Sequence, residues 1–204
     1  GHFLIEARKA GYHVPDNLYN HWLKYAQSNA RKINKRNFRY QTYTLFLLSL
    51  AGEPNVGAMN LVRENHLDDL DPLSRKLLAG AYFLAGQKDA AEKVDKYMTT
   101  EISTYRESAG TYGSTLRDQC LVAYISQIMG DKTNAMKLMR SIAHQFKPQE
   151  WYSTQENAFA LIAICEIYGE RNLIGSSRSF SMEFQDGKVK NYELQGYQIS
   201  MDIS

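Results

Sequence analysis

The chain has 204 residues, with 24 lysines and arginines against 22 aspartates and glutamates, which leaves a formal net charge of +2. Hydrophobic residues make up 44% of the sequence and charged residues 23%, and these globular proportions exclude a disordered or collagen-like chain. The near-neutral charge does not support nucleic-acid binding, and no apolar run approaches the roughly 20 residues of a membrane-spanning helix. Two cysteines are too few for a disulfide framework. The length predicts one domain, or one domain and part of another.

A repeated pattern predicts paired helices, because an apolar helix ends at a glycine and a second helix follows it. The pattern occurs at Gly11, Gly52, Gly86, Gly130 and Gly169. Glycine after a helix end accepts the left-handed backbone conformation that a β-carbon disfavours. Intervals of 34 to 44 residues between these glycines are typical of stacked helical hairpins. We expect helices near residues 1–10, 15–32, 36–51, 54–66, 72–85, 87–99, 114–129, 131–146 and 153–168.

Helix-capping residues stand at several of the expected starts. Asp71 precedes a proline, which is the arrangement of a cap followed by a first-turn proline. Ser153 and Glu156 have the spacing of a capping box, in which each side chain bonds the backbone N–H of the other residue. We expect Ser114 or Thr115 to cap the equivalent earlier helix.

The apolar pattern predicts two layers of helices. Helices 114–129 and 153–168 are apolar on most sides, so we expect both to be buried nearly all round. Helix 131–146 carries its apolar residues on one stripe, which is typical of an outer, half-exposed layer. The expected inner helices are 36–51, 72–85, 114–129 and 153–168, and the expected outer helices are 15–32, 54–66, 87–99 and 131–146.

Near the C-terminus the apolar period changes to two, which predicts short β-strands. Segments 180–184 and 197–203 alternate in this way, and Asp186 and Gly187 form a favoured hairpin turn. So few strands bury too little apolar surface to be stable alone, so we expect a sheet that is completed elsewhere. The predicted domains are a helical-hairpin domain and a β-strand segment of a following domain, residues 1–174 and 175–204.

The cysteines and histidines offer no clear reactive site. Cys120 and Cys165 stand in strongly apolar helices, which predicts small buried hydrophobes, with a disulfide between inner helices or a reactive thiol as alternatives. No histidine pairs with a cysteine or a second histidine three or four residues away, so a zinc site has little support. We expect surface or hydrogen-bonded side chains at His2, His13, His21, His66 and His144.

A local basic cluster allows two interpretations. It predicts either a patch for an acidic partner or nucleic acid, or a helix C-terminus followed by a solvated loop. We favour the second, because charge elsewhere in the chain cancels the patch. The cluster comprises Arg31, Lys32, Lys35, Arg36 and Arg39, with Phe38, Tyr40 and Tyr43 interleaved.

A group of carboxylates also allows two interpretations, acid–base or Ca²⁺ chemistry on one side and helix capping with loop solvation on the other. No glycine-centred calcium loop is present, so we favour capping and solvation. The group comprises Glu64, Asp68, Asp69 and Asp71. We therefore expect no catalytic, cofactor-binding or metal-binding residue in this chain.

Segments 1–12, 112–119 and 151–158 resemble the thioester-domain region of bacterial alpha-2-macroglobulin-like proteins. The Ser-Thr-Gln at 153–155, at the start of a helix, is also similar to complement-type relatives. The resemblance covers about the first 175 residues and rests on the order and spacing of the segments. It implies part of an α/α toroid of helical hairpins, followed by a β-sandwich. The uncapped first helix likewise leads us to expect a piece of a longer protein.

In that family, a thioester between Cys and Gln of a Cys-x-Glu-Gln motif acylates a target once proteolysis exposes it. This chain departs from the motif, because Leu-Val-Ala follows Cys120 and Glu-Ile-Tyr follows Cys165. The matching stretch 34–37 also lacks the histidine that assists acylation in complement-type relatives. The resemblance therefore implies a non-catalytic fragment of an endopeptidase inhibitor that traps peptidases by conformational capture, without the thioester motif.

The resemblance further implies peptidases as partners of the full-length parent, contacts with its other domains, no cofactor, and a periplasmic, cell-surface or secreted location. The alternative is a tetratricopeptide-like interaction module, which segment 81–91 and the 34-residue interval favour locally. An α/α-toroid glycosidase or lyase has less support, because no carboxylate pair stands at the helix starts.

Overall fold

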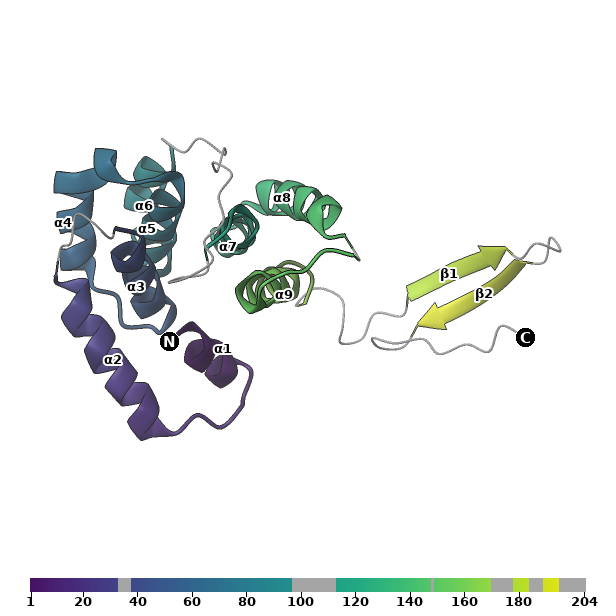
Figure 1. The fold of residues 1–204 in the computed structure, drawn as a ribbon, viewed down its shortest axis with the longest axis horizontal. Coiled ribbons are helices and arrows are strands. Elements are labelled where there is room, and N and C mark those ends of the chain that lie inside the picture. The colour runs from purple at the N-terminus through teal and green to yellow at the C-terminus, as the bar shows by residue number, and fades with distance from the viewer. Residues whose placement is uncertain (33–37, 97–112, 148, 170–177, 184–188, 195–204) are drawn as a thin grey trace.

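The predicted helices are present in a computed structural model, which describes residues 1–32, 38–96, 113–147, 149–169, 178–183 and 189–194 (Figure 1). The observed bounds agree with the expected ones to within a few residues, apart from the sixth helix, whose expected end lies partly outside the described residues. The elements are α1 (His2–Lys9), α2 (Asp16–Ala30), α3 (Phe38–Leu50), α4 (Val56–His66), the 3-10 helix η1 (Leu67–Asp69), α5 (Pro72–Leu84), α6 (Lys88–Asp95), α7 (Thr115–Ile128), α8 (Lys132–Gln145), α9 (Thr154–Tyr168), β1 (Arg178–Glu183) and β2 (Val189–Leu194).

Four of the five predicted glycine breaks have the expected geometry. Gly11, Gly52, Gly86 and Gly130 adopt φ values between 75° and 85°, in the left-handed region. In each case the next backbone N–H reaches back to the carbonyl five residues earlier, which satisfies an otherwise unpaired helix-end acceptor. The prediction is wrong at Gly169, whose φ of −71° continues the helical conformation. No described helix follows Gly169, so no reversal of the chain is imposed there.

The two-layer prediction is confirmed for three inner helices. Helices α3 and α5, α5 and α7, and α7 and α9 lie side by side, and the outer helices cover them as returning segments (Figure 1). The buried residues of α3, α5 and α7 extend round most of each helix, including Leu45, Phe46 and Leu48 of α3. Helix α8 instead buries the single stripe of Ala135, Met139 and Ile142. Its remaining faces are half-buried or exposed.

Gly80 permits the close contact at the centre of this layer. A β-carbon at this position of α5 would lie 2.7 Å from Cγ2 of Ile125 on α7 and 3.1 Å from Cε2 of Phe46 on α3. The lack of a side chain therefore lets α5 sit tightly between its two neighbours. Tyr82 and Tyr124, both almost wholly buried, fill the remaining core volume on these helices.

The prediction of an inner helix buried on most sides is wrong for the fourth one, α9. Helix α9 buries only Glu156, Ala160, Ala163 and Ile167, whereas burial nearly all round was expected. Its opposite face exposes a stripe at helical spacing, because no described element covers that side. The exposed residues of this α9 stripe are Leu161, Ile164, Cys165 and Tyr168.

The C-terminal strands form an antiparallel hairpin in which Phe180 of β1 lies opposite Tyr192 of β2. Ser181 Oγ donates a hydrogen bond to Asn191 Oδ1 across the pair at 2.6 Å. The expected strand 197–203 and the turn residues lie outside the described residues, and the boundary after residue 174 stays a prediction.

Side-chain caps begin several helices where the sequence places them. Ser114 Oγ accepts from the N–H of Arg117 at 3.2 Å, so Ser114, not Thr115, caps α7. Ser153 and Glu156 form the predicted capping box, with Ser153 Oγ accepting from Glu156 N and Glu156 Oε2 accepting from Ser153 N at 2.7 Å.

Within the described part of the chain, no helix has both the length and the hydropathy that crossing a membrane requires.

We expect the Ser153→Ala substitution to lower the free energy of unfolding by about 1 kcal/mol, because it leaves the N–H of Glu156 without its acceptor at a buried helix start. Urea unfolding followed by circular dichroism measures the change. Ser141→Ala, on the exposed face of α8, is the matched control and should cause no loss. Equal stability of the Ser153 variant and the wild type would contradict the capping role.

Candidate functional site

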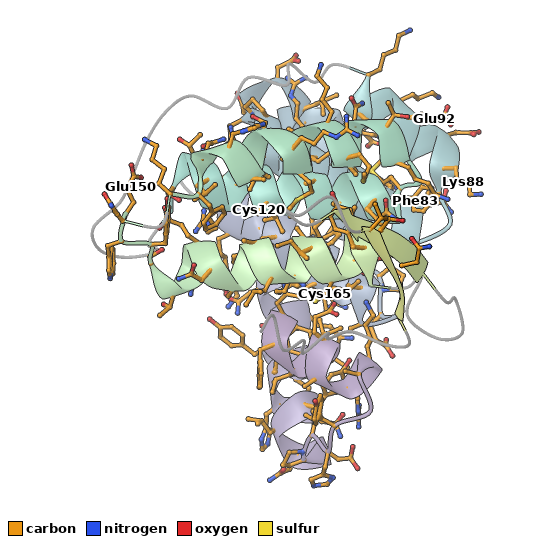
Figure 2. The ribbon with its side chains drawn as sticks, turned by 90° about the vertical axis from the view of Figure 1, so that its right-hand side faces the viewer. Phe83, Lys88, Glu92, Cys120, Glu150 and Cys165 are labelled. Atoms are coloured by element: carbon orange, nitrogen blue, oxygen red, sulfur yellow. The ribbon has the colours of Figure 1, made fainter. Side chains whose placement is uncertain are left out.

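The inner helices run in the same direction, so that their N-terminal ends meet at one edge of the helical body. Figure 2 shows Glu150, just before α9, at one end, and Phe83 and Lys88, at the α5–α6 connection, at the other. Each helix start presents unpaired N–H groups and the positive end of the helix dipole. We call this edge the N-terminal rim, defined by Arg39, Asp71, Ser114, Arg117, Asp118, Ser153 and Glu156.

A charge network connects three helix starts of the N-terminal rim. Arg39 of α3 donates from Nε to Asp71 Oδ2 at 2.6 Å and from Nη1 to Asp118 Oδ2 at 3.4 Å. Arg117 holds the other oxygen, Asp118 Oδ1, through Nε at 2.9 Å and Nη2 at 2.7 Å. The Asp118 side chain is fully buried, so both of its oxygens require these donors.

This arrangement is suited to holding helices, and it offers little for acid–base chemistry. Asp71 also caps α5, since its Oδ1 accepts from the N–H of Ser74 at 2.8 Å. Glu156 is committed to the capping box of α9, and Asp118 is held between two arginines. A general acid or base needs a carboxyl group that can exchange its proton with a substrate. The three rim carboxylates are instead occupied by cations and backbone N–H groups.

A groove of about 650 Å³ lies beside the N-terminal rim. It is bounded by the first turn of α7, the C-terminal end of α8 and the segment that leads into α9. Tyr152 stabilises one wall, because its hydroxyl accepts from the N–H of Lys147 at 2.7 Å and donates to the carbonyl of Gln145 at 3.0 Å. Trp151 is 75% exposed at this edge. The groove therefore combines a structured wall with an exposed aromatic surface.

The basic cluster predicted from the sequence is divided in the structure. Arg31 is the C-cap residue of α2, in agreement with the helix-end interpretation, and Lys32 is exposed beside it. Arg39 belongs to the N-terminal rim, where Asp71 and Asp118 bind it. Lys35 and Arg36 lie outside the described residues.

The interleaved aromatic residues are likewise separated. Phe38 packs against the ring of His66, with centroids 5.2 Å apart, and the hydroxyl of Tyr40 contacts that of Tyr25 at 3.2 Å. Tyr43 points inward to His2. These side chains form no common surface.

The predicted carboxylate group has separate partners. Glu64 pairs with Arg63 at 3.1 Å, and Asp68 lies 3.6 Å from Arg75. Asp69 contacts His66 Nδ1 at 3.1 Å, and Asp71 belongs to the rim. Among the described residues, no three metal-ligating side chains are grouped in a way that could hold an ion. The lack of a catalytic or metal site stays a prediction.

The two cysteines differ in environment (Figure 2). Cys120 is buried, and burial, together with the nearby carboxylates of Glu156 and Asp118, raises the pKa of its thiol to about 12. Cys165 is exposed on the α9 stripe, which contradicts the expected burial. Both are free thiols in this structure, so the disulfide alternative is not observed.

Of the histidines, His2 has the most extensive contacts, and sequence reasoning did not single it out. It is 7% exposed and contacts residues from three other helices, α3, α7 and α9. Apart from Glu6 on the same helix, the side chains it contacts lie between 41 and 157 residues away, so spacing in the sequence does not mark the position. His13, His21 and His144 are exposed.

We expect Asp118→Asn to lower the free energy of unfolding by about 2–3 kcal/mol, because the neutral amide leaves Arg39 and Arg117 without their shared counter-charge. Chemical denaturation of the purified chain measures this loss. Asp68→Asn removes an exposed carboxylate that also lies near an arginine, and this control should be indistinguishable from the wild type. A loss of equal size in both variants would show that the buried network has no special importance.

Comparison with solved structures identifies the fold. The chain superposes on native alpha-2-macroglobulin of Escherichia coli with a TM-score of 0.68 and 22% identity, over 95% of this chain and 13% of the other. A fragment of the E. coli protein from domain MG7 to the C-terminus matches with a TM-score of 0.65 and 23% identity, over 95% of this chain and 33% of the fragment. Salmonella alpha-2-macroglobulin reacted with methylamine matches with a TM-score of 0.66 and 22% identity, over 94% of this chain and 13% of the other.

The sequence matches no protein-family model and no curated protein. The chain spans about one eighth of the full-length structures that it resembles. At these identities the comparison establishes the fold, and the resemblance predicted from three short segments is confirmed at that level. The chain thus has the fold of a helical region in the C-terminal part of bacterial alpha-2-macroglobulins.

Proposed function

We propose that this chain is a non-catalytic part of an alpha-2-macroglobulin-type endopeptidase inhibitor, a protein that traps peptidases by conformational capture. The observation that carries the proposal is the structural match over 95% of the chain to E. coli alpha-2-macroglobulin. On the family resemblance we assign the chain to part of the α/α toroid of the thioester domain, and residues 175–204 to strands of a following β-sandwich.

The exposed apolar surfaces support a position within a larger assembly. The α9 stripe leaves Leu161 62% exposed and Ile164 41% exposed on a helix that packs well on its other side. At the opposite end of the helical series, Phe3 of α1 is 78% exposed, and Tyr25 of α2 is 61% exposed. Large apolar side chains grouped on one face mark an interface. We infer that other parts of the same parent chain cover both edges.

The chemistry of the chain supports a scaffold role. Neither cysteine begins a Cys-x-Glu-Gln motif. Burial also raises the pKa of the Cys120 thiol to about 12, which disfavours the reactive thiolate. Any thioester of the parent would therefore be formed by residues outside this chain. On the family resemblance we propose that the parent acts in the periplasm, at the cell surface or in the medium, with peptidases as its partners.

A peptidase-protection assay on the full-length protein that contains residues 1–204 tests the proposal. A trapped peptidase loses access to large substrates but still cleaves small ones. After mixing with an active serine peptidase, we expect hydrolysis of casein to stop while hydrolysis of a small chromogenic peptide continues. Unchanged cleavage of both substrates would overturn the proposal and favour the interaction-module alternative. Loss of both activities would indicate an active-site inhibitor and would also overturn it.

The isolated chain should behave as a scaffold without covalent reactivity. We expect its mass to stay unmodified after incubation with methylamine and after mixing with an active peptidase, because carboxamides such as Gln119 and Gln155 are poor acyl donors. Intact-protein mass spectrometry measures this. The Cys165→Ser variant, which lacks the exposed thiol, is the matched control and should give the same result. A stoichiometric adduct in the wild type would contradict the scaffold role.

A further inference from the structure

We draw no further inference here: the strongest candidate, the groove between the first turn of α7, the end of α8 and the segment that leads into α9, carries nothing, because its charged residues Lys147 and Glu150 pair with each other and nothing in the described part of the chain shows what occupies it.

Discussion

The structure depends on the burial of helices that are apolar on nearly every side. Helices α5 and α7 cannot meet water along any face without exposing large apolar side chains, so each needs neighbours all round. The short glycine-ended reversals bring the chain back after each inner helix, and the returning outer helix covers one side. The inner helices must then stack against one another, and all of them point the same way.

This parallel stacking has an electrostatic cost at the edge where the helices begin. Helix dipoles that point the same way repel one another, and Arg39 adds a positive charge to the start of α3. Asp71 and Asp118 offset both effects, because each stands in the first turn or cap of the neighbouring helix and both bind Arg39. The N-terminal rim is thus a consequence of the layering. Its carboxylates bind Arg39 and Arg117, and Asp71 also caps α5.

Local signals in the sequence predicted the features that depend on local physics. The cap at Ser153, the reversal at Gly130 and the single stripe of α8 all follow from residues within one or two turns of each other. The failures have non-local causes. The α9 stripe is apolar in sequence and yet exposed, because no described element packs against that side of the helix.

Contacts between residues far apart in the sequence also explain why the roles of Arg39 and His2 were missed. Arg39 belongs by sequence to a basic cluster, but its charge is bound by carboxylates 32 and 79 residues further along the chain. His2 meets Tyr43 and Tyr124 only after the helices have stacked, and composition or spacing gives no warning of that contact. The strand Val189–Leu194 was overlooked because its own alternation is weaker than that of the later segment.

The missing side chain at Gly80 has a mechanical consequence for the whole molecule. The side chains of Phe46 and Ile125 press directly on the α5 backbone here, so α5 cannot slide past α3 or α7 without collision. Strain applied from outside would be released first at the edge helix α1, which buries only His2 and Ile5.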